Sequence, residues 1–370
     1  MTSTDQNLLK SIAGEFKTEG EIISVRPFGN GHINDTFLIE TAGEKPNYIL
    51  QRKNHLIFKD VPAMMENIDR VCKHIESKLR KANDPLLGKK TIRQISTHDA
   101  KLYFKDEKGN FWTVMNFVAN SKSVEMIEKP EMAEVAGIAF GRFQKQLADL
   151  PGGPLSETIK DFHNIYFRIN NFEKAKASNP VGRLATVKAE VEEIESRMEK
   201  MKTLQKLADS GKLPIRVTHN DTKINNVLFD KDTDEILAVI DLDTVMPGLV
   251  HFDFGDAMRT AANTVEEDET DISKVKFNLE VFRYFTKGFL SETRDTLTPQ
   301  EIELLPHSCQ FMTYIMALRF LTDYIDGDTY YKIKHPEHNI ERARNQIKLV
   351  QEMEKSEQKM KEVVNAAIKN

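Results

Sequence analysis

The sequence predicts an α+β protein of two lobes, a small antiparallel β-sheet lobe followed by a larger, mainly helical lobe. Five short strand-like segments, with one helical segment after the third, occupy residues 1–118. Helical periodicity of apolar residues dominates after residue 121. The 370 residues also exceed the length that one hydrophobic core usually serves. We therefore expect domains over 1–118 and 119–370, joined by a hinge at 116–123 rather than by a flexible linker.

The strands of the first lobe are read from alternation of apolar and polar residues. They are expected over Glu21–Phe28, Thr36–Glu40, Tyr48–Arg52, Thr91–Ser96 and Trp112–Val118. The helix after the third strand is expected over Ala63–Lys81, because its apolar positions recur with helical spacing. These positions are Ile68, Val71, Cys72, Ile75 and Leu79.

The second lobe is read mainly as helices. They are expected over Pro130–Leu150, over the highly charged and solvent-exposed stretch Thr186–Ser210, and from Ile340 to near the end. Thr298-Pro299-Gln300-Glu301 has the features of a helix start, with an N-cap threonine, a proline and a glutamate that closes a capping box. Three short strands interrupt the helices, at Ile215–Thr218, Val227–Phe229 and Ile236–Ile240.

Composition narrows the class of protein. The formal net charge of -5 argues against general nucleic-acid binding, which needs a basic face. The two cysteines, Cys72 and Cys309, provide no metal-ligand spacing or disulfide framework, and we expect buried free thiols. The first residues lack the pattern of a signal peptide, and no apolar run reaches the ~18 residues of a membrane span. A cytoplasmic protein is therefore expected. The sequence leaves the oligomeric state open, with a monomer as the simplest expectation.

One loop carries the clearest chemical signal. Residues 219–226 form the pattern H-x-D-x-K-x-x-N between two expected strands. In phosphoryl transfer a carboxylate accepts the proton of the attacking hydroxyl, and Asp221 fits that role. Lys223 is placed to neutralise charge on the transferred phosphate, and the side-chain oxygen of Asn226 to hold Mg²⁺. His219 is read as a structural support of the loop. A loop with no catalytic role is the alternative, which the combined pattern disfavours.

A second acidic segment follows this loop. The strand before Asp241 leads directly into Asp241-Leu242-Asp243. Mg²⁺ is usually bound by one or two carboxylates together with phosphate oxygens. We therefore expect Asp241 to be a magnesium ligand, and Asp243 to support it or to bind a second metal. Asp253-Phe254-Gly255 spells a metal-binding motif of protein kinases but follows no strand, so Asp253 is read as structural support for the loop.

These residues resemble the aminoglycoside phosphotransferase superfamily, which has a protein-kinase-like fold. The resemblance rests on His219, Asp221, Asn226, Ile240-Asp241 and Asp253–Asp256. Further segments resemble the branch of that superfamily that phosphorylates N-acetylhexosamines at the anomeric carbon. They include Gly31-His32-Ile33-Asn34, Tyr48-Ile49-Leu50-Gln51, Arg216–Asn226, Ile240–Gly248 and Arg319-Phe320-Leu321, and they span nearly the whole chain.

The resemblance implies transfer of the ATP γ-phosphate to the anomeric hydroxyl of N-acetylglucosamine or N-acetylgalactosamine, with Mg²⁺ as cofactor. It implies that His32, Arg319 and Tyr330 contact the sugar, beside Asp221. Arg319 interrupts an apolar stretch, where an unpaired cation is costly to bury. An ion pair with Asp323, four residues further on, is the alternative explanation for this arginine.

For ATP, the resemblance implies a glycine loop over the phosphates and an adenine site at the hinge. The loop residues are Gly29, Gly31 and Asn34, and the hinge residues with backbone contacts are Asn116 and Val118. A protein kinase carries a lysine on its third strand, whereas here the chosen position holds Gln51. By strand alternation Gln51 and Lys53 share one face of that strand. Glu66 on the following helix is the expected ion-pair partner there.

Two other functions remain open from the sequence. One is a kinase for another small alcohol, such as homoserine, choline or a different sugar. Choline would need an aromatic cage for its cation, and the candidate rings are Phe162, Tyr166, Phe167, Tyr330 and Tyr331. The other is a non-catalytic nucleotide-binding protein, which the intact set of Asp221, Asn226 and Asp241 disfavours.

Overall fold

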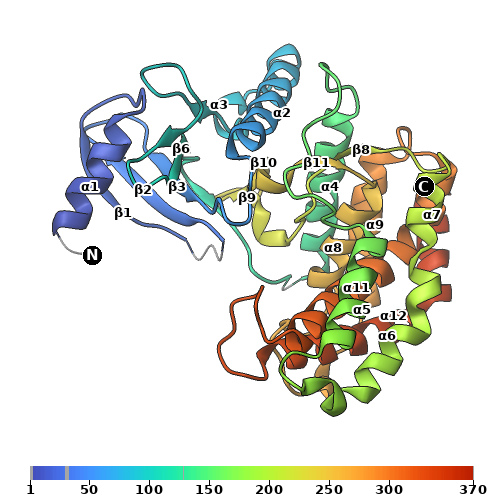
Figure 1. Cartoon of the computed structure of the whole chain (residues 1–370). Coiled ribbons are helices and arrows are strands. Elements are labelled where there is room, and N and C mark those ends of the chain that lie inside the picture. The colour runs from blue at the N-terminus through green and yellow to red at the C-terminus, as the bar shows by residue number, and fades with distance from the viewer. Residues whose placement is uncertain (1–2, 30–32, 128, 370) are drawn as a thin grey trace. The chain divides into compact units, whose positions relative to one another are not determined.

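The computed structural model describes residues 3–29, 33–127 and 129–369 (Figure 1). The chain forms two compact units, each assembled from three stretches. Unit 1 consists of Met1–Ser123, Asp149–Lys160 and Val227–Pro247, and unit 2 of Val124–Ala148, Asp161–Asn226 and Gly248–Asn370. Unit 1 contains the larger antiparallel sheet and unit 2 is mainly helical, as the sequence predicted.

The sheet of unit 1 is antiparallel, with strand order β1-β2-β3-β6-β4, and β5 pairs with β6. Its strands are β1 (Ile22–Pro27), β2 (Asp35–Thr41), β3 (Tyr48–Lys53), β4 (Gln94–Ile95), β5 (Phe104–Lys105) and β6 (Phe111–Asn116). Alternate side chains such as Val25, Ile39 and Leu50 form one buried cluster with Leu9 and Phe16. Leu9 belongs to helix α1 (Ser3–Gly14), which the sequence analysis did not predict.

Helix α2 (Val61–Lys81) follows the third strand at the predicted position. Its buried residues include Ile68, Val71 and Cys72 of the predicted apolar positions. Buried Asn67 binds two other segments of unit 1: its Nδ2 donates to the carbonyl oxygens of Ser156 (2.7 Å) and Val245 (3.0 Å). Helix α2 therefore fixes the chain just after the acidic segment at 241–243. The short helix α3 (Leu87–Lys90) follows.

A second sheet of unit 1 has the order β10-β9-β7. Strand β7 (Ser121–Lys122) pairs with β9 (Val227–Asp230), and β9 pairs with β10 (Ile236–Val239). This pairing joins residues 227–247 to unit 1, although in the sequence they come directly after the loop at residues 219–226, which belongs to unit 2. The predicted division of the chain at residue 118, which groups them with the second lobe, stays a proposal. A 3₁₀ turn, η3 (Leu242–Thr244), and strand β11 (Met246–Gly248) end this segment.

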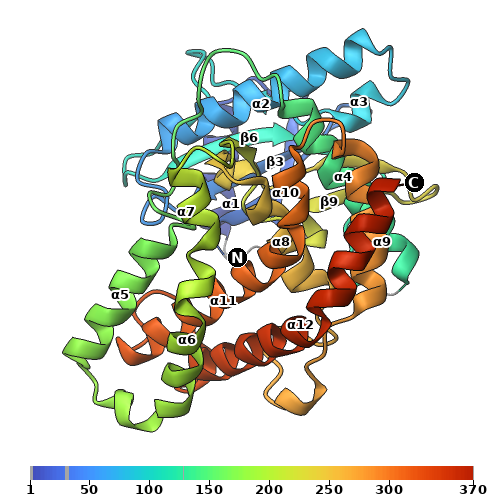
Figure 2. The same ribbon diagram turned by 90° about the vertical axis from the view of Figure 1, so that its right-hand side faces the viewer.

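Unit 2 is built around helix α11 (Leu305–Ile325), which is buried on nearly all sides. Helices α5 (Ile165–Ser178) and α12 (His338–Lys369) pack against α11, and α6 (Lys188–Met201) packs against both α11 and α12 (Figure 2). The remaining elements of unit 2 are α4 (Pro130–Leu147), η1 (Arg183–Thr186), α7 (Thr203–Asp209), β8 (Arg216–Thr218), η2 (Ile224–Asn226), α8 (Val250–Ala261), η4 (Ile272–Lys274), α9 (Leu279–Thr293) and α10 (Pro299–Glu303).

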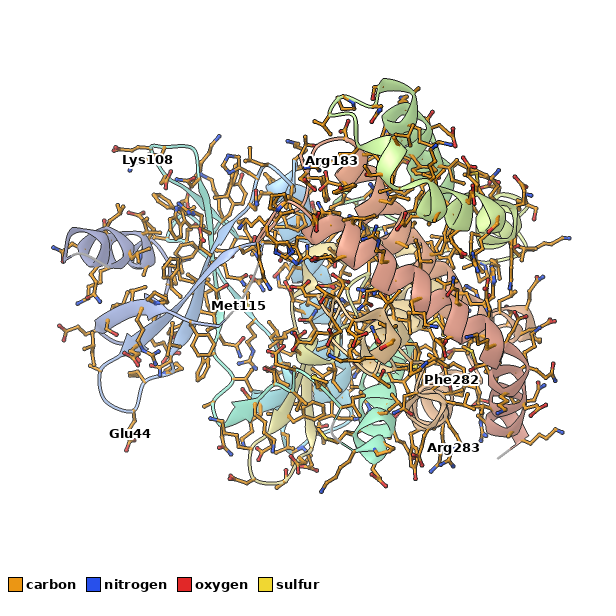
Figure 3. All side chains as sticks on the ribbon, turned by 90° about the horizontal axis from the view of Figure 1, so that it is seen from below. Glu44, Lys108, Met115, Arg183, Phe282 and Arg283 are labelled. Carbon is orange, nitrogen blue, oxygen red and sulfur yellow. The ribbon has the colours of Figure 1, made fainter. Side chains whose placement is uncertain are left out.

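Helices α4 and α9 approach each other closely through two glycines. A Cβ atom on Gly288 would lie 2.0 Å from the carbonyl oxygen of Glu134, and one on Gly137 would lie 2.2 Å from that of Phe285. Helix α9 is amphipathic: Phe282 is fully buried, whereas the neighbouring Arg283 is exposed and stacks on Tyr284 (Figure 3). The close packing of α4 against α9 fixes α4, which carries Gln144 toward the loop at residues 219–226.

Several predictions of local structure are confirmed. Thr298 and Glu301 form the expected capping box at the start of α10, and both cysteines are buried free thiols. The charged stretch 186–210 forms two helices, but it is not fully exposed as predicted, because Ile194, Met201 and Leu204 are buried. Among the described residues, no helix has both the length and the apolar character that a membrane span requires.

Candidate functional site

The H-x-D-x-K-x-x-N loop is held by a buried carboxylate from helix α8. Asp253 accepts hydrogen bonds from the backbone N–H groups of His219 (2.9 Å) and Asn220 (2.7 Å) and from the side chain of Gln144 (2.6 Å). Asn220 has a left-handed backbone with φ of 65°, which asparagine tolerates better than most residues. Burial raises the pKa of Asp253, and His219 together with these amides partly offsets the effect.

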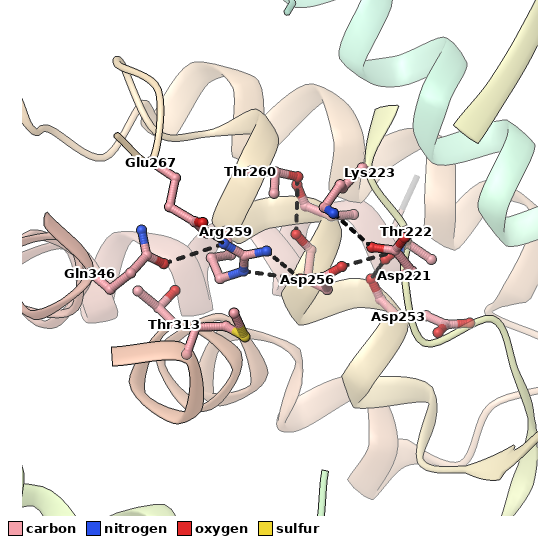
Figure 4. A network of polar contacts seen from close by, with 12 residues as sticks. Asp221, Thr222, Lys223, Asp253, Asp256, Arg259, Thr260, Glu267, Thr313 and Gln346 are labelled. Atoms are coloured by element: carbon pink, nitrogen blue, oxygen red, sulfur yellow. Dashed lines mark hydrogen bonds and ion pairs between the residues drawn. The ribbon is translucent and has the colours of Figure 1, made fainter. Parts of the chain in front are cut away.

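A second carboxylate of α8 continues this support (Figure 4). Asp256 accepts a hydrogen bond from the backbone N–H of Thr222 at 3.1 Å and pairs with Arg259 at 3.0 Å. Arg259 in turn binds Glu267 at 2.5 Å. Although burial opposes the charge of Arg259, the two carboxylates raise its pKa above the ordinary value. This buried pair was not predicted from the sequence. Its signal there is the spacing of three residues between Asp256 and Arg259 on one helix.

The beginning of the loop is packed as tightly as it is hydrogen-bonded. The His219 ring is fully buried and meets Phe140 and Phe143 edge-on, at centroid distances of 6.2 and 5.7 Å. A Cβ atom on Gly248 would lie 2.4 Å from Thr218 Oγ1, so only glycine leaves room for the loop there. These contacts fix the backbone just before Asn220.

Asp221 is the central ionisable group of the loop. Its carboxylate lies 3.2 Å from Lys223 Nζ. Burial opposes ionisation of Asp221, but Lys223 and His219 outweigh it and hold its pKa below the ordinary value. The same carboxylate raises the pKa of Lys223, against the effect of burial. Asp221 is therefore ionised at neutral pH, as a proton acceptor must be.

Asn226 lies five residues after Asp221 and points back to it. Its Nδ2 donates to the backbone carbonyl (2.8 Å) and to Oδ2 (3.3 Å) of Asp221. These bonds orient the side chain so that the amide oxygen is the atom left for another partner. Oxygen is the donor type that Mg²⁺ prefers, so the side chain fits the predicted role.

Asp241 belongs to unit 1 and follows strand β10. Its backbone is left-handed, with φ of 60° and ψ of 54°, and the residue is exposed to solvent. Non-glycine residues in this conformation cluster at functional sites. The acidic side chain again supplies only oxygen donors, so it also fits a magnesium ion.

A buried ion pair lies next to Asp241 in unit 1. Lys53 of strand β3 pairs with Asp243 at 2.6 Å, and both side chains are almost completely buried. The other oxygen of Asp243 accepts a hydrogen bond from Asn34 Nδ2 at 2.7 Å. Asn34 Oδ1 accepts a bond from the backbone N–H of Asn54. This network connects the end of the glycine-containing turn with strand β3 and the acidic segment.

The structure corrects two predictions about strand β3, the position of its cation and the partner of that cation. Gln51 and Lys53 share a face, as alternation predicted, and Lys53 Nζ donates to Gln51 Oε1 at 2.6 Å. The buried cation of the strand is therefore Lys53, whereas the sequence analysis chose Gln51 for that position. The expected partner Glu66 was wrong: it is exposed, and Asp243 takes its place. Alternation could have directed attention to Lys53, but not to a partner 190 residues away.

The expected nucleotide residues of unit 1 are only partly described. Gly31 and His32 lie outside the described residues. Gly29 has a φ of 73° at the start of the turn, which favours glycine. The Asn116 side chain is occupied by the backbone of Arg93 (2.6 Å) and Thr91 (3.0 Å). In the described contacts the backbone N–H of Val118 donates to no group, so it is the available donor of the expected hinge.

Arg319 lies within a cluster of aromatic rings in unit 2. Its guanidinium carbon is 5.3 Å from the centroid of Phe162, 5.7 Å from that of Tyr330 and 5.5 Å from that of Tyr331. The alternative ion pair with Asp323 is not formed. Asp323 instead accepts bonds from the backbone N–H groups of Tyr330 (2.8 Å) and Tyr331 (2.9 Å). Arg319 and Tyr330 are therefore brought together, as the sequence analysis expected of sugar contacts.

Comparisons with known proteins identify the family of the chain and several solved structures with a similar fold. A family model described as the phosphotransferase enzyme family matches residues 24–278, more than half of the chain. A solved spectinomycin phosphotransferase, in complex with ADP and spectinomycin, has a TM-score of 0.54 at 13% identity, over 94% of this chain and 98% of that one. An aminoglycoside phosphotransferase from Alicyclobacillus acidocaldarius has a TM-score of 0.60 at 10% identity, over 96% of both chains.

A choline kinase from Cryptosporidium parvum is also similar, with a TM-score of 0.55 at 14% identity over 98% of this chain and 99% of that one. Likeness at such low identity establishes the fold alone. The fold is the protein-kinase-like α+β fold that the sequence analysis expected.

The buried Lys53–Asp243 pair generates a prediction about stability. Lys53→Met should lower the free energy of unfolding by about 3–5 kcal/mol, because the carboxylate of Asp243 would stay buried without its cation. Urea unfolding monitored by circular dichroism measures this difference. The matched control is Lys73→Met, which removes the exposed ion pair with Asp69 on helix α2 and should cost about 0.5 kcal/mol or less. Equal losses in the two variants would contradict the prediction.

Proposed function

Because the chain belongs to the phosphotransferase enzyme family, we propose that it transfers the γ-phosphate of ATP to the anomeric hydroxyl of an N-acetylhexosamine. The proposed products are ADP and the sugar 1-phosphate. The observation that carries the proposal is the placement of Arg319 inside the aromatic cluster with Tyr330, which favours a polar acceptor without positive charge over a cationic one. The role of each proposed residue follows from its contacts.

Asp221 is the proposed base. It accepts the proton of the anomeric hydroxyl while that oxygen forms a bond to the γ-phosphorus and the bond from phosphorus to the bridging oxygen of ADP breaks. Its ionised state at neutral pH supports this role. Lys223, 3.2 Å from Asp221, is placed to neutralise charge on the transferred phosphoryl group. His219 and Asp253 fix the loop backbone without touching the reacting atoms.

Asn226 and Asp241 are the proposed magnesium ligands. The orientation of Asn226 by Asp221 and the exposed carboxylate of Asp241 are the features that support the assignment. When bound, Mg²⁺ would neutralise charge on the phosphate oxygens of ATP. Asp253 is excluded from this set because its oxygens are already used by His219, Asn220 and Gln144.

The proposed ATP site lies in unit 1. Gly29 and Asn34 stand at the turn expected over the phosphates, and the buried network of Lys53 and Asp243 positions Asn34. Gln51 is proposed to assist through its bond to Lys53. Adenine is proposed to bind backbone groups at Asn116 and Val118. Gly31 and His32 remain proposed contacts to the phosphates and the sugar.

An acetamido sugar matches the acceptor residues. Aromatic rings cover the guanidinium of Arg319, and its N–H groups are the natural donors to the acetamido carbonyl oxygen. The ring of Tyr330 is 54% exposed, so it can stack on a sugar ring. Choline would have to enter an aromatic cluster that already contains a guanidinium, and the two positive charges would repel each other. This geometry disfavours choline and leaves homoserine and other sugars as alternatives.

The first functional prediction concerns the base. Asp221→Asn should keep ATP binding but lower kcat by about 10²–10⁴-fold, because positioned general-base catalysis contributes that much. Turnover is measured with ATP, Mg²⁺ and N-acetylglucosamine, and ATP binding by calorimetry. Asp209→Asn, on helix α7, is the control and should retain activity. A near-normal kcat in Asp221→Asn would remove Asp221 from the base role.

The second prediction concerns pH. Lys223 lowers the pKa of Asp221, so removing the ammonium in Lys223→Met should raise that pKa. The unprotonated base is then lost at a higher pH as the solution is acidified. The acidic limb of the kcat/KM profile should therefore move to higher pH, in addition to any fall in kcat. The profile of the exposed control Lys212→Met should stay in place. An acidic limb that does not move in Lys223→Met would show that the pair does not tune the base.

The third prediction concerns the acceptor. Arg319→Ala should raise KM for N-acetylglucosamine by about five-fold or more, because a hydrogen bond to a neutral ligand is worth about 0.5–1.5 kcal/mol and the stranded carbonyl adds to the loss. KM for ATP should stay nearly constant. The same assay is run with N-acetylgalactosamine, choline and homoserine. Turnover of choline or homoserine above that of both sugars would reject the proposed acceptor while leaving the kinase assignment intact.

A further inference from the structure

A polar cavity of about 400 Å³ lies in unit 2 between helices α5 and α11 and the segment that follows α11. Its volume falls within the range of about 300–1,000 Å³ that small-ligand sites occupy. The lining residues recur at intervals of three or four on each helix, so each helix contributes one face. They include Arg168, Asn171 and Lys174 on α5, Arg319 and Thr322 on α11, and Asp326 at the C-cap of α11.

Two arginines that line this cavity, Arg168 and Arg319, contact the same residue, Phe162, the first at its carbonyl oxygen and the second at its ring. Arg168 donates from Nε and Nη2 to the carbonyl oxygen of Phe162, at 3.2 and 2.7 Å. Arg319 is 9% exposed, and its Nη1 donates only to the sulfur of Met316 at 3.5 Å. Within the described ranges, neither arginine lies within ion-pair distance of a carboxylate. Burial, and next the charge of Arg319, lower the pKa of Arg168 to about 10, against smaller opposing effects of Tyr331, Tyr330 and Asp161.

The acidic residues of the cavity do not pair with these two arginines. The carboxylate of Asp323 is already used by the backbone N–H groups of Tyr330 and Tyr331 and by the Nδ2 of Asn339 (2.9 Å). Asp326 lies seven residues after Arg319, which is about 10 Å along the helix axis. Arg168 and Arg319 therefore line the cavity without a carboxylate within ion-pair distance among the described residues.

We propose that Arg168 and Arg319 in this cavity bind a carboxylate or phosphate group of the acceptor, which is then an N-acetylhexosamine with an acidic substituent. The sugar part rests on the proposed function, whereas the anion site rests on the two arginines. Guanidinium N–H groups match carboxylate and phosphate oxygens in planar, paired hydrogen bonds. In the described contacts the Nη1 of Arg168 donates to no group, so it is free to bind such an anion.

Calorimetry of the full chain without nucleotide tests the anion site. The probes are N-acetylglucosamine, its 6-phosphate, its 6-carboxylate and inorganic phosphate. The charged sugars should bind about ten-fold or more tightly than the neutral sugar, because hydrogen bonds between charged groups are the stronger ones. Arg168→Gln should reduce this ratio to about one, and Arg168→Lys should preserve part of it. Arg283→Gln is the matched control, since Arg283 also stacks on the aromatic residue next to it but lies on the exposed face of α9.

Each possible result of this experiment either supports or overturns the proposal. Equal affinity for charged and neutral sugars overturns it, and so does a ratio that survives in Arg168→Gln. If Arg168→Gln is unfolded by circular dichroism, the ratio in Arg168→Lys decides, and an unchanged or absent ratio there overturns the proposal. Inorganic phosphate that binds as tightly as the sugar phosphate identifies a free-anion site and overturns the acceptor part. Arg168-dependent binding of the charged sugars, with turnover by ATP and Mg²⁺ of the neutral sugar alone, overturns the acceptor part. Turnover of none of these sugars would reject the proposed function and leave the anion site standing.

Discussion

The candidate active site depends on one constraint, the use of buried α8 carboxylates as hydrogen-bond acceptors for the loop backbone. Asp253 binds two consecutive N–H groups, of His219 and Asn220, and Asp256 binds that of Thr222. A loop held at three of four consecutive amides has little freedom left, so the position of Asp221 is set before any ligand arrives. The cost of burying these carboxylates is offset by the same bonds and by Arg259.

Unit 1 also contains a buried carboxylate that holds several chain segments together. The buried carboxylate of Asp243 is paired with Lys53 and hydrogen-bonded to Asn34, and it therefore connects strand β3, the turn after β1 and the segment that contains Asp241. In unit 2 buried carboxylates hold the backbone on both sides of Asp221, and in unit 1 the buried Asp243 stands two residues after the exposed Asp241. Rigid support of exposed functional groups is what preorganised catalysis requires.

The acceptor residues show why fold alone does not settle a substrate. The similar structures share the fold at 10–14% identity, and they include both an aminoglycoside phosphotransferase and a choline kinase. The difference must lie in side chains that the fold presents. Here the aromatic rings that could receive a cation surround Arg319 instead. A guanidinium in that position occupies the place among the rings that a cationic ligand would take, and this is the basis of the proposed preference for a non-cationic acceptor.

The sequence by itself determined the features that depend on neighbouring residues: the antiparallel strands of the first lobe with the helix after the third strand, the capping box at Thr298, and the loop that carries Asp221 and Asn226. Local periodicity and spacing encode these features directly. Only the tertiary structure decided that Lys53 rather than Gln51 is the buried cation of β3, that Glu66 is not its partner, and that Arg319 faces aromatic rings rather than Asp323. Such pairings join residues far apart in the chain or choose among several possible partners, and burial in the folded state makes that choice.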